Sequence, residues 1–317
     1  MRVYLWTPSN NGNDFKTEDR DRGINRLKNM GYEITIDDCV NQDYLGLGIN
    51  HRSKLIEFFD RFSKDNNSII IPYYGGLTSN RILDDIVHFA DKLTNQLVCG
   101  KSDLTNVLNV LYKVTGQVCL YGIDLSKISN PHLTARELEI IKKSLNKEEF
   151  MFNCPKEYND GYWYVGERET FEHGRWGYFY EGGEVSKISG ISVGGNLDSL
   201  CILLGTNYSP DFKDKLVVLE TVSDVSPRTF LRNLKHLIMG SNIMDAQAII
   251  VGKFAPKSLL NDKNVLYQLF IDELNIQDIP IVYNVDFSHT EPSYPFYIGG
   301  KLHIDLETQV IKVSTNS

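Results

Sequence analysis

The sequence predicts an α/β fold that consists of a helix-covered parallel sheet followed by a second, mixed β-rich domain. Apolar strand-like runs alternate with helical patterns over residues 1–125, and this alternation is typical of a parallel sheet with helices on both faces. From residue 158 onward, aromatic residues and glycine become frequent and helical periodicity fades. We therefore expect an α/β domain over 1–125, a connector over 126–160 and a β-rich domain over 161–317.

The first domain shows its elements as short patterns bounded by turn residues. The helix expected over 51–65 places Leu55, Phe58, Phe59 and Phe62 on one face. Strands are expected at 2–8, 32–38, 68–76, 95–100 and 117–123, with helices at 22–32, 51–65, 80–93 and 103–115. Ligands of such sheets bind beyond the carboxyl ends of the strands. Two glycine-containing turns, Gly75-Gly76 and Gly100-Lys101-Ser102, fall at that edge.

The second domain mixes strand and helix patterns. The aromatic and glycine-rich segment suggests short antiparallel strands, and one helix is expected within the preceding connector. Further strands are expected at 214–221, 246–254 and 278–289, helices at 226–239 and 265–274, and a terminal hairpin at 301–314.

Composition limits the class of protein. Apolar residues make up 42% and charged residues 23%, and the net charge of −8 argues against a nucleic-acid-binding surface. No basic leader and no apolar run of about 20 residues is apparent, so we expect no membrane span and a cytoplasmic location. Five scattered cysteines suit reduced thiols and show no metal spacing: Cys39, Cys99, Cys119, Cys154 and Cys201.

The Gly100-Lys101-Ser102 turn allows three interpretations. A phosphate-binding loop needs a glycine where the chain has Asn95, and residues 96–99 have strand character, which leaves no open loop of amides. A serine between a buried strand and a helix is also a rigid nucleophile, because the helix amino terminus favours a developing oxyanion. The third interpretation is structural, with Ser102 as a helix N-cap.

Several motifs taken in order resemble the family of LD-carboxypeptidases and microcin-C immunity peptidases. They are "SIIIPYYGGLTSNRILDDI", "QLVCGKSDLTNVLNVLYKVTGQVCLYG", "ISVGGNLDSLCILLGT", "DKLVVLE", "AQAIIVGKF" and "IPIVYNVDFSHTEP". The resemblance runs over nearly the whole chain, from "WTPSN" to the last strands. It implies a flavodoxin-like or amidotransferase-like amino-terminal domain, a smaller β-rich carboxyl-terminal domain and, usually, a dimer.

The resemblance also implies a serine hydrolase that cleaves amide bonds without a metal or cofactor. Ser102 would be the nucleophile, Glu220 the acid and His289 the base, and the amides of Gly76 and Asp103 would form the oxyanion hole. These roles fit the residue types, because serine needs a base within hydrogen-bond reach and a carboxylate fixes the tautomer of that base. Without the resemblance, Glu220 is as readily a surface carboxylate and His289 a residue of a turn.

The chain departs from the family pattern in ways that leave its substrate open. Lys101 replaces the usual aromatic residue before the serine. A cation there could attract a substrate carboxylate, shift the pKa values of nearby groups or point into solvent. Ile123 replaces a proline, Thr221 follows the acid where aspartate is common, and Glu291 stands where immunity peptidases tend to have a second histidine. A murein LD-tetrapeptide and an aminoacyl-nucleotide antibiotic both remain candidates.

The aromatic segment is the clue to the substrate. It holds Tyr158, Tyr162, Trp163, Tyr164, Phe171, Trp176, Tyr178, Phe179 and Tyr180. Cross-strand packing is the simpler explanation. The alternative is a loop that stacks a flat group over the site, and for this role Trp163 matches best the loop tryptophan of the immunity peptidases. The competing hypothesis for the function is that a protein with this fold binds its ligand without catalysing a reaction.

Overall fold

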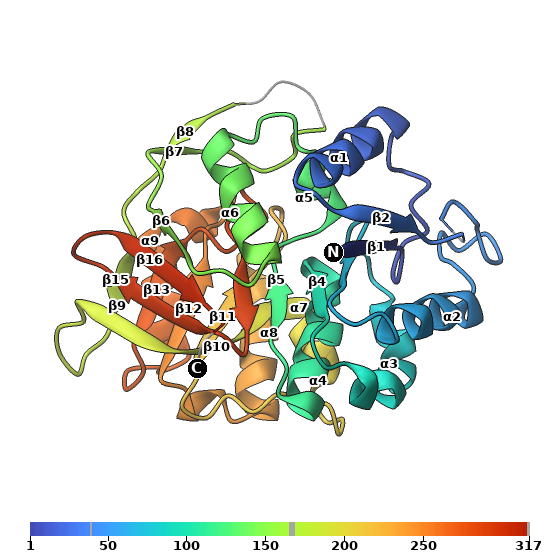
Figure 1. Cartoon of the computed structure of the whole chain (residues 1–317). Helices are drawn as coiled ribbons and strands as arrows, with labels where there is room; N and C mark the ends of the chain where they lie inside the picture. The colour runs from blue at the N-terminus through green and yellow to red at the C-terminus, as the bar shows by residue number, and fades with distance from the viewer. Residues whose placement is uncertain (39, 165–168, 316–317) are drawn as a thin grey trace. The chain divides into compact units, whose positions relative to one another are not determined.

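The computed structural model describes residues 1–38, 40–164 and 169–315, so Cys39 lies outside the described residues. The chain separates into two compact units, Met1–Asn146 and Lys147–Ser317 (Figure 1). The expected connector, 126–160, is divided between them. Its two helices belong to the first unit and its strands to the second.

The first unit is a doubly wound α/β domain. Its five strands pair in parallel in the order β2-β1-β3-β4-β5, which is the order of flavodoxin-like sheets. The elements are β1 (Arg2–Trp6), α1 (Thr17–Asn29), β2 (Glu33–Ile36), α2 (Arg52–Ser63), β3 (Ile69–Pro72), α3 (Leu83–Phe89), β4 (Leu97–Gly100), α4 (Thr105–Thr115), β5 (Cys119–Tyr121), α5 (Leu125–Ser129) and α6 (Ala135–Leu145). The predicted parallel sheet is confirmed.

Local sequence explains these elements. The predicted face of α2 is buried, and fully burying side chains such as Leu55 and Phe58 stabilises a fold by roughly 1.5–3 kcal/mol each. All residues of β3 and β4 are buried, as expected for central parallel strands. Helix α4 ends at Gly116, whose φ of +70° gives the left-handed cap that glycine adopts at little cost.

The second unit is a mixed sheet flanked by helices. Its eight strands follow the order β6-β16-β15-β10-β11-β12-β13-β9. The elements are β6 (Phe150–Asn153), β7 (Glu157–Tyr158), β8 (Phe171–Glu172), β9 (Gly177–Phe179), β10 (Lys187–Asn196), α7 (Leu197–Leu203), β11 (Leu216–Glu220), α8 (Pro227–Gly240), β12 (Ala248–Gly252), α9 (Lys263–Tyr267), β13 (Ile281–Val285), β14 (Phe296–Ile298), β15 (Lys301–Asp305) and β16 (Val310–Ser314). The predicted terminal hairpin is the antiparallel pair β15 and β16.

Strand β10 joins the two halves of this sheet. Its first half, Lys187–Ile191, pairs antiparallel with β15, and its second half, Ser192–Asn196, pairs parallel with β11. The parallel centre β10-β11-β12-β13 leaves the carboxyl ends of its strands at one edge. Glu220 ends β11 at that edge, directly opposite Asn196.

The second unit is the longer of the two, as the expected bounds 161–317 and 1–125 already imply. Strand β6, from the expected connector, and β9, from the aromatic segment, form the two outer strands of its sheet. No helix in the described ranges is both long and apolar enough to cross a membrane.

Candidate active site

Ser102 lies in a strained turn at the end of β4. It is the first residue of a short 3-10 helix, η3 (Ser102–Leu104), which leads into α4. Its φ of +58° lies in the left-handed region, which costs a serine energy. The Ser102 N–H donates to the Tyr121 hydroxyl at 3.1 Å, and the Thr105 hydroxyl donates to the Ser102 carbonyl at 2.6 Å. These bonds hold the strained backbone, and a fixed backbone orients the serine side chain as a nucleophile requires.

The two other interpretations of this turn are not supported. Residues 97–100 form the buried strand β4, so the backbone before Lys101 is not an open phosphate loop. The N-cap positions of η3 and α4 are occupied by Lys101 and Leu104 and not by Ser102. Lys101 itself is half-buried with an extended backbone, and its role toward a substrate stays a prediction.

The side chain of Asp103 hydrogen-bonds to the segments that follow two other strands of the sheet. Its Oδ2 accepts a bond from the Ser9 hydroxyl at 2.6 Å and another from the Ser79 N–H at 2.8 Å. Ser9 follows β1, and Ser79 follows β3, so the buried carboxylate joins the segments after β1, β3 and β4. This network fixes the residue that directly follows Ser102.

Gly75 and Gly76 let the chain after β3 pass close to the serine turn. A Cβ on Gly75 would lie 2.9 Å from the Ser102 Cβ and 3.3 Å from the Asp103 amide nitrogen. Gly76 has a φ of +151°, and a Cβ there would lie 2.2 Å from the Ser9 hydroxyl oxygen. The resemblance implies the amides of Gly76 and Asp103 as oxyanion donors. The contacts bring Gly75, the neighbour of Gly76, close to Ser102 and Asp103. The role of the two amides stays a prediction.

In the second unit, Glu220 and His289 form a hydrogen-bonded pair. The Glu220 Oε2 and the His289 Nδ1 are 2.5 Å apart. The Glu220 side chain is fully buried, whereas 20% of the His289 side chain is exposed. Burial raises the pKa of the nearby Asp198, and the charge of Glu220 raises it further. The pairing leaves the His289 Nε2 as the ring nitrogen that can exchange a proton with a substrate or nucleophile.

A glycine on the strand between them permits this pairing. Gly252 ends β12, which lies between β11 and β13. A Cβ on Gly252 would lie 2.4 Å from the Phe287 carbonyl oxygen and 2.9 Å from the Glu220 Cβ. Because position 252 carries no side chain, the segment after β13 crosses over β12 and brings His289 to Glu220. Sequence reasoning had not assigned Gly252 a role.

A second glycine, Gly161, lies against the backbone of His289. Its φ is +83°, and a Cβ there would lie 1.9 Å from the His289 carbonyl oxygen. Asn159 and Glu291 exchange backbone bonds of 2.9 and 3.1 Å, so the two segments are joined two residues away from this contact. The residues Asn159, Asp160 and Gly161 are typical of a turn, but nothing local in the sequence indicates which segment the turn contacts.

The aromatic segment divides into a packed part and an open part. Trp176 is buried against Phe152, and Phe179 stacks on Tyr283 with ring centroids 4.5 Å apart. Tyr162 and Tyr164 are exposed, and the half-buried Trp163 packs edge-on against Tyr164 at 5.5 Å. Core packing therefore explains Trp176 and Phe179. The segment around Trp163 instead offers aromatic surface next to Gly161, whose backbone lies against that of His289.

Comparison with known families identifies the family of the chain. Residues 3–122 match the LD-carboxypeptidase N-terminal domain, and residues 189–304 match the LD-carboxypeptidase C-terminal domain. The chain belongs to the LD-carboxypeptidase family. It is accordingly a serine-type carboxypeptidase-like hydrolase, and its family includes the microcin immunity peptidases.

Individual relatives are distant but cover the whole fold. A putative carboxypeptidase of Treponema pallidum is 25% identical over 94% of this chain and 87% of its own, and the microcin C7 self-immunity protein MccF of Escherichia coli is 25% identical over 92% and 87%. A probable murein peptide carboxypeptidase of Bacillus subtilis is 24% identical over 87% and 80%. The crystal structure of an MccF-like protein from Bacillus anthracis is similar with a TM-score of 0.86 at 24% identity, covering 99% of this chain and 97% of that one. A structure of MccF in complex with aspartyl sulfamoyl adenosine is similar with a TM-score of 0.82 at 20% identity, covering 99% and 96%.

Proposed function

We propose that this chain hydrolyses an amide bond near a free carboxylate, using Ser102, Glu220 and His289 as a catalytic triad. The observation that supports this most is the 2.5 Å bond between the buried Glu220 carboxylate and the His289 Nδ1. It is the relation between orienting acid and base that a serine triad requires. The strained turn at Ser102 supplies the second part, a rigid serine at a strand end.

In the proposed reaction, the Ser102 Oγ attacks the amide carbonyl carbon and its proton passes to the His289 Nε2. Glu220 accepts the bond from the His289 Nδ1 and stabilises the imidazolium that forms. The amides of Gly76 and Asp103 stabilise the negative oxygen of the tetrahedral intermediate. His289 then gives its proton to the leaving amine. In the second half, His289 takes a proton from water, the water oxygen attacks the acyl carbon, and the Ser102 Oγ leaves and recovers the proton from His289.

For the substrate we propose an aminoacyl-nucleotide, with Trp163 stacking on the base and Lys101 binding a carboxylate. The open aromatic surface around Trp163 supports this choice, and relatives of the same fold bind aminoacyl sulfamoyl nucleotides. A murein LD-tetrapeptide is the second candidate, because the Bacillus subtilis relative is named a probable murein peptide carboxypeptidase. We expect the enzyme to act as a cytoplasmic homodimer, and light scattering in solution tests the dimer.

The test is cleavage followed by mass spectrometry, with an aminoacyl sulfamoyl adenosine and an LD-tetrapeptide in separate reactions. We expect turnover with wild type and its loss in Ser102→Ala, at a nearly unchanged melting temperature. Full activity of the variant would remove Ser102 from the triad. Tight binding of either compound by wild type without any cleavage would instead favour a protein that only binds its ligand.

A further inference from the structure

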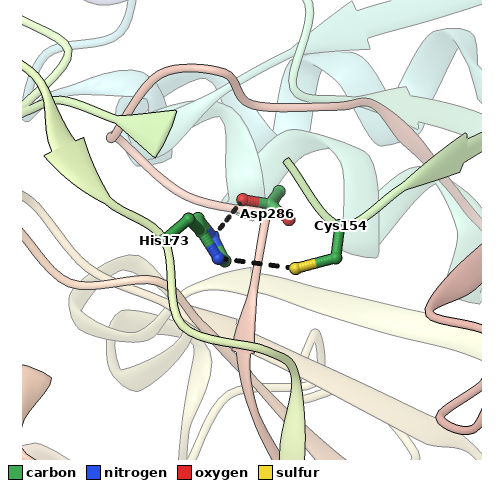
Figure 2. A group of neighbouring side chains, drawn as sticks. All are labelled: Cys154, His173 and Asp286. Carbon is green, nitrogen blue, oxygen red and sulfur yellow. Dashed lines mark hydrogen bonds and ion pairs between the residues drawn. The ribbon is translucent and has the colours of Figure 1, made fainter. Parts of the chain in front are cut away.

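The second unit contains another group of titratable side chains, formed by Cys154, His173 and Asp286. Cys154 follows β6, His173 follows β8 and Asp286 follows β13, so three separate segments meet here (Figure 2). The Cys154 Sγ is 3.5 Å from the His173 Nδ1, and the His173 Nε2 is 2.8 Å from the Asp286 Oδ1. The order of groups is thiol, imidazole and carboxylate, which is the arrangement of nucleophile, base and orienting acid.

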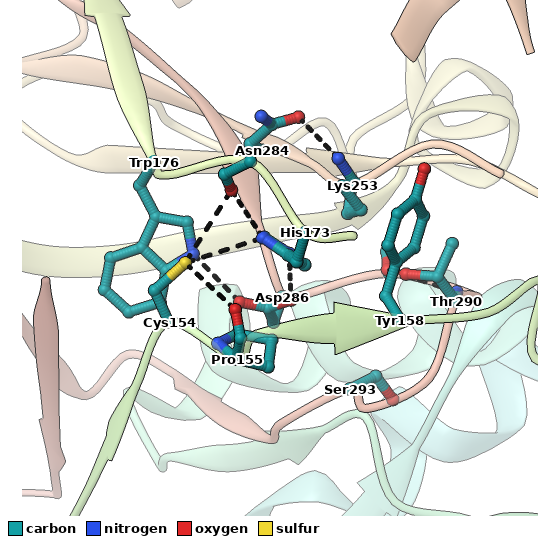
Figure 3. Close-up of polar contacts among 12 residues, drawn as sticks. Cys154, Pro155, Tyr158, His173, Trp176, Lys253, Asn284, Asp286, Thr290 and Ser293 are labelled. Carbon is teal, nitrogen blue, oxygen red and sulfur yellow. Dashed lines mark hydrogen bonds and ion pairs between the residues drawn. The ribbon is translucent and has the colours of Figure 1, made fainter. Parts of the chain in front are cut away.

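Asp286 and its partners hold the imidazole in one orientation. The Asp286 carboxylate is fully buried, and its Oδ2 accepts a 2.9 Å bond from the Trp176 indole N–H (Figure 3). The His173 Nδ1 also lies 2.5 Å from the Gly174 carbonyl oxygen. Burial lowers the pKa of His173, but the bonds to Asp286 and Cys154 outweigh it and raise this pKa to about 9. Burial raises the pKa of Asp286, and the bonds from His173 and Trp176 oppose that shift.

A second positive charge lies close to the group. Lys253 is buried, with its Nζ 3.2 Å from the Asn284 Oδ1 and 4.3 Å from the centre of the Tyr158 ring (Figure 3). Burial lowers the pKa of Lys253 to about 8, and the charges of Asp286 and Cys154 oppose that shift. Lys253 and His173 thus both interact with one buried carboxylate, that of Asp286.

The thiol is also accessible. Cys154 is half-buried and lines a cavity of about 620 Å³. His173 lines the same cavity, and Lys156, Glu172 and Arg175 add charges of both signs to its wall. Cys154 also lies 3.7 Å from the Pro155 and Gly174 carbonyl oxygens, and a thiol donates only weakly to such acceptors.

We propose that Cys154 is a nucleophilic thiol, assisted by His173 and Asp286, that low-molecular-weight disulfides modify in this cavity. The sulfur attacks one sulfur atom of the disulfide while its proton resides on His173. A bond forms between Cys154 and that sulfur atom, the original S–S bond breaks, and the other half leaves as a thiolate that takes the proton from His173. The disulfide is reduced and Cys154 is oxidised to a mixed disulfide, so atoms and electrons balance.

A metal site built from the same three residues is the competing assignment. Their ligand atoms lie within 4.8 Å of one another, which a single ion would span. However, a histidine must offer a lone pair to a metal, and here both ring nitrogens face acceptors. The positive charge of Lys253 further disfavours a bound cation. The geometry therefore favours covalent chemistry at the sulfur.

The test is a labelling experiment on the full chain in the presence of a chelator. Iodoacetamide alkylation is followed from pH 6 to 9 by peptide mapping, and modification by glutathione disulfide is mapped at pH 7. Cys201 is the matched internal control, because it is also half-buried and burial raises its pKa to about 11. We expect Cys154 to form the mixed disulfide first and to react at pH 6.5 at least about tenfold faster than a cysteine in an unstructured peptide.

Two variants separate the role of His173 from general effects. In His173→Gln the alkylation rate of Cys154 at pH 6.5 should fall about tenfold, and in His236→Gln, at an exposed position, it should not change. If His173→Gln fails to fold, the pH profile of wild type alone decides. A Cys154 rate no higher than that of the peptide at pH 6.5 would overturn the proposal. So would protection of Cys154 by equimolar Zn²⁺ without chelator, which would make this group a metal site.

Discussion

The carbonyl oxygen of His289 lies 1.9 Å from the position that a Cβ on residue 161 would occupy. Gly161 is thus the residue against which the backbone of the proposed catalytic base rests. The two backbone bonds between Asn159 and Glu291 hold the segments together two residues from this contact. Any side chain at position 161 has to displace His289, its own segment or both.

We therefore expect Gly161→Ala to lower kcat/KM about 100-fold, because a shift of about 1 Å in a catalytic group has an effect of that size. Gly205→Ala is the matched control. Gly205 has a similar φ of +77°, but a Cβ there would meet nothing within 4 Å. The two variants share the cost of alanine at a positive φ, and only Gly161→Ala adds the collision. Steady-state kinetics of both variants decide, and equal activities would show that the contact does not position His289.

A second prediction concerns the strain at Ser102. With its φ of +58°, this position is one at which glycine is favoured and alanine is not. Ser102→Gly and Ser102→Ala should both be inactive, but the glycine variant should be more stable by about 1 kcal/mol. That difference corresponds to a melting temperature about 2–4 °C higher for a domain of this size. Scanning calorimetry of the two variants measures it, and an alanine variant of equal or greater stability would argue that the turn carries no strain.

Much of the fold could be predicted because local patterns determine it. The buried face of α2, the fully apolar strands β3 and β4 and the terminal hairpin all follow from periodicities within single segments. The outer strands of the second sheet could not be placed, because β6 and β9 carry no signal for which strand each will pair with.

The candidate site divides in the same way. The strand-to-helix transition made Ser102 a candidate nucleophile, beside two other interpretations of the same turn. The pairing of Glu220 with His289 joins residues 69 positions apart, and only the family resemblance suggested it. Gly252 and Gly161 read as ordinary strand-end and turn glycines, because what they make room for comes from distant segments. Steric space between distant segments leaves no local pattern in a sequence.

The third prediction tests the orienting role of Glu220. Glu220→Gln keeps the shape of the side chain but removes the charge that stabilises the His289 imidazolium. We expect kcat to fall by about 10³- to 10⁴-fold with little change in KM, as for other triads that lose their acid. Binding of a non-hydrolysable analogue, measured by calorimetry, should be retained. A loss of less than about tenfold in kcat would indicate that Glu220 serves the structure and not the reaction.

The fourth prediction uses Trp163 to separate the two substrates. Stacking of a base on an aromatic ring is worth about 1–3 kcal/mol, so Trp163→Ala should raise KM for an aminoacyl sulfamoyl adenosine about 5- to 150-fold. Trp163→Phe should restore part of the affinity. Cleavage of an LD-tetrapeptide, which has no base to stack, should be unchanged in both variants. If kcat/KM fell equally for the two substrates, Trp163 would stabilise the structure of the site and would not recognise the base.

The last prediction concerns the pH dependence of stability at His173. The pKa of His173 in the folded chain is about 9, above the value near 6.5 that it has when unfolded. A raised folded-state pKa stabilises the protein fully below pH 6.5, and this stabilisation is lost as the pH rises through 9. The other titratable groups that face His173 are Cys154, Asp286 and Tyr158, whose ring lies 5.4 Å from the His173 ring, with Lys253 close by.

We therefore expect wild type to exceed His173→Gln in free energy of unfolding most strongly at pH 6, with the difference shrinking steadily towards pH 9.5. Urea unfolding at a series of pH values measures both proteins, and taking the difference cancels the contribution of groups that titrate alike in the two. His236→Gln, at an exposed position, should differ from wild type by a constant small amount across the same range. A difference between wild type and His173→Gln that grows with pH would mean that His173 is neutral in the folded chain, and the ion pair with Asp286 would then be absent.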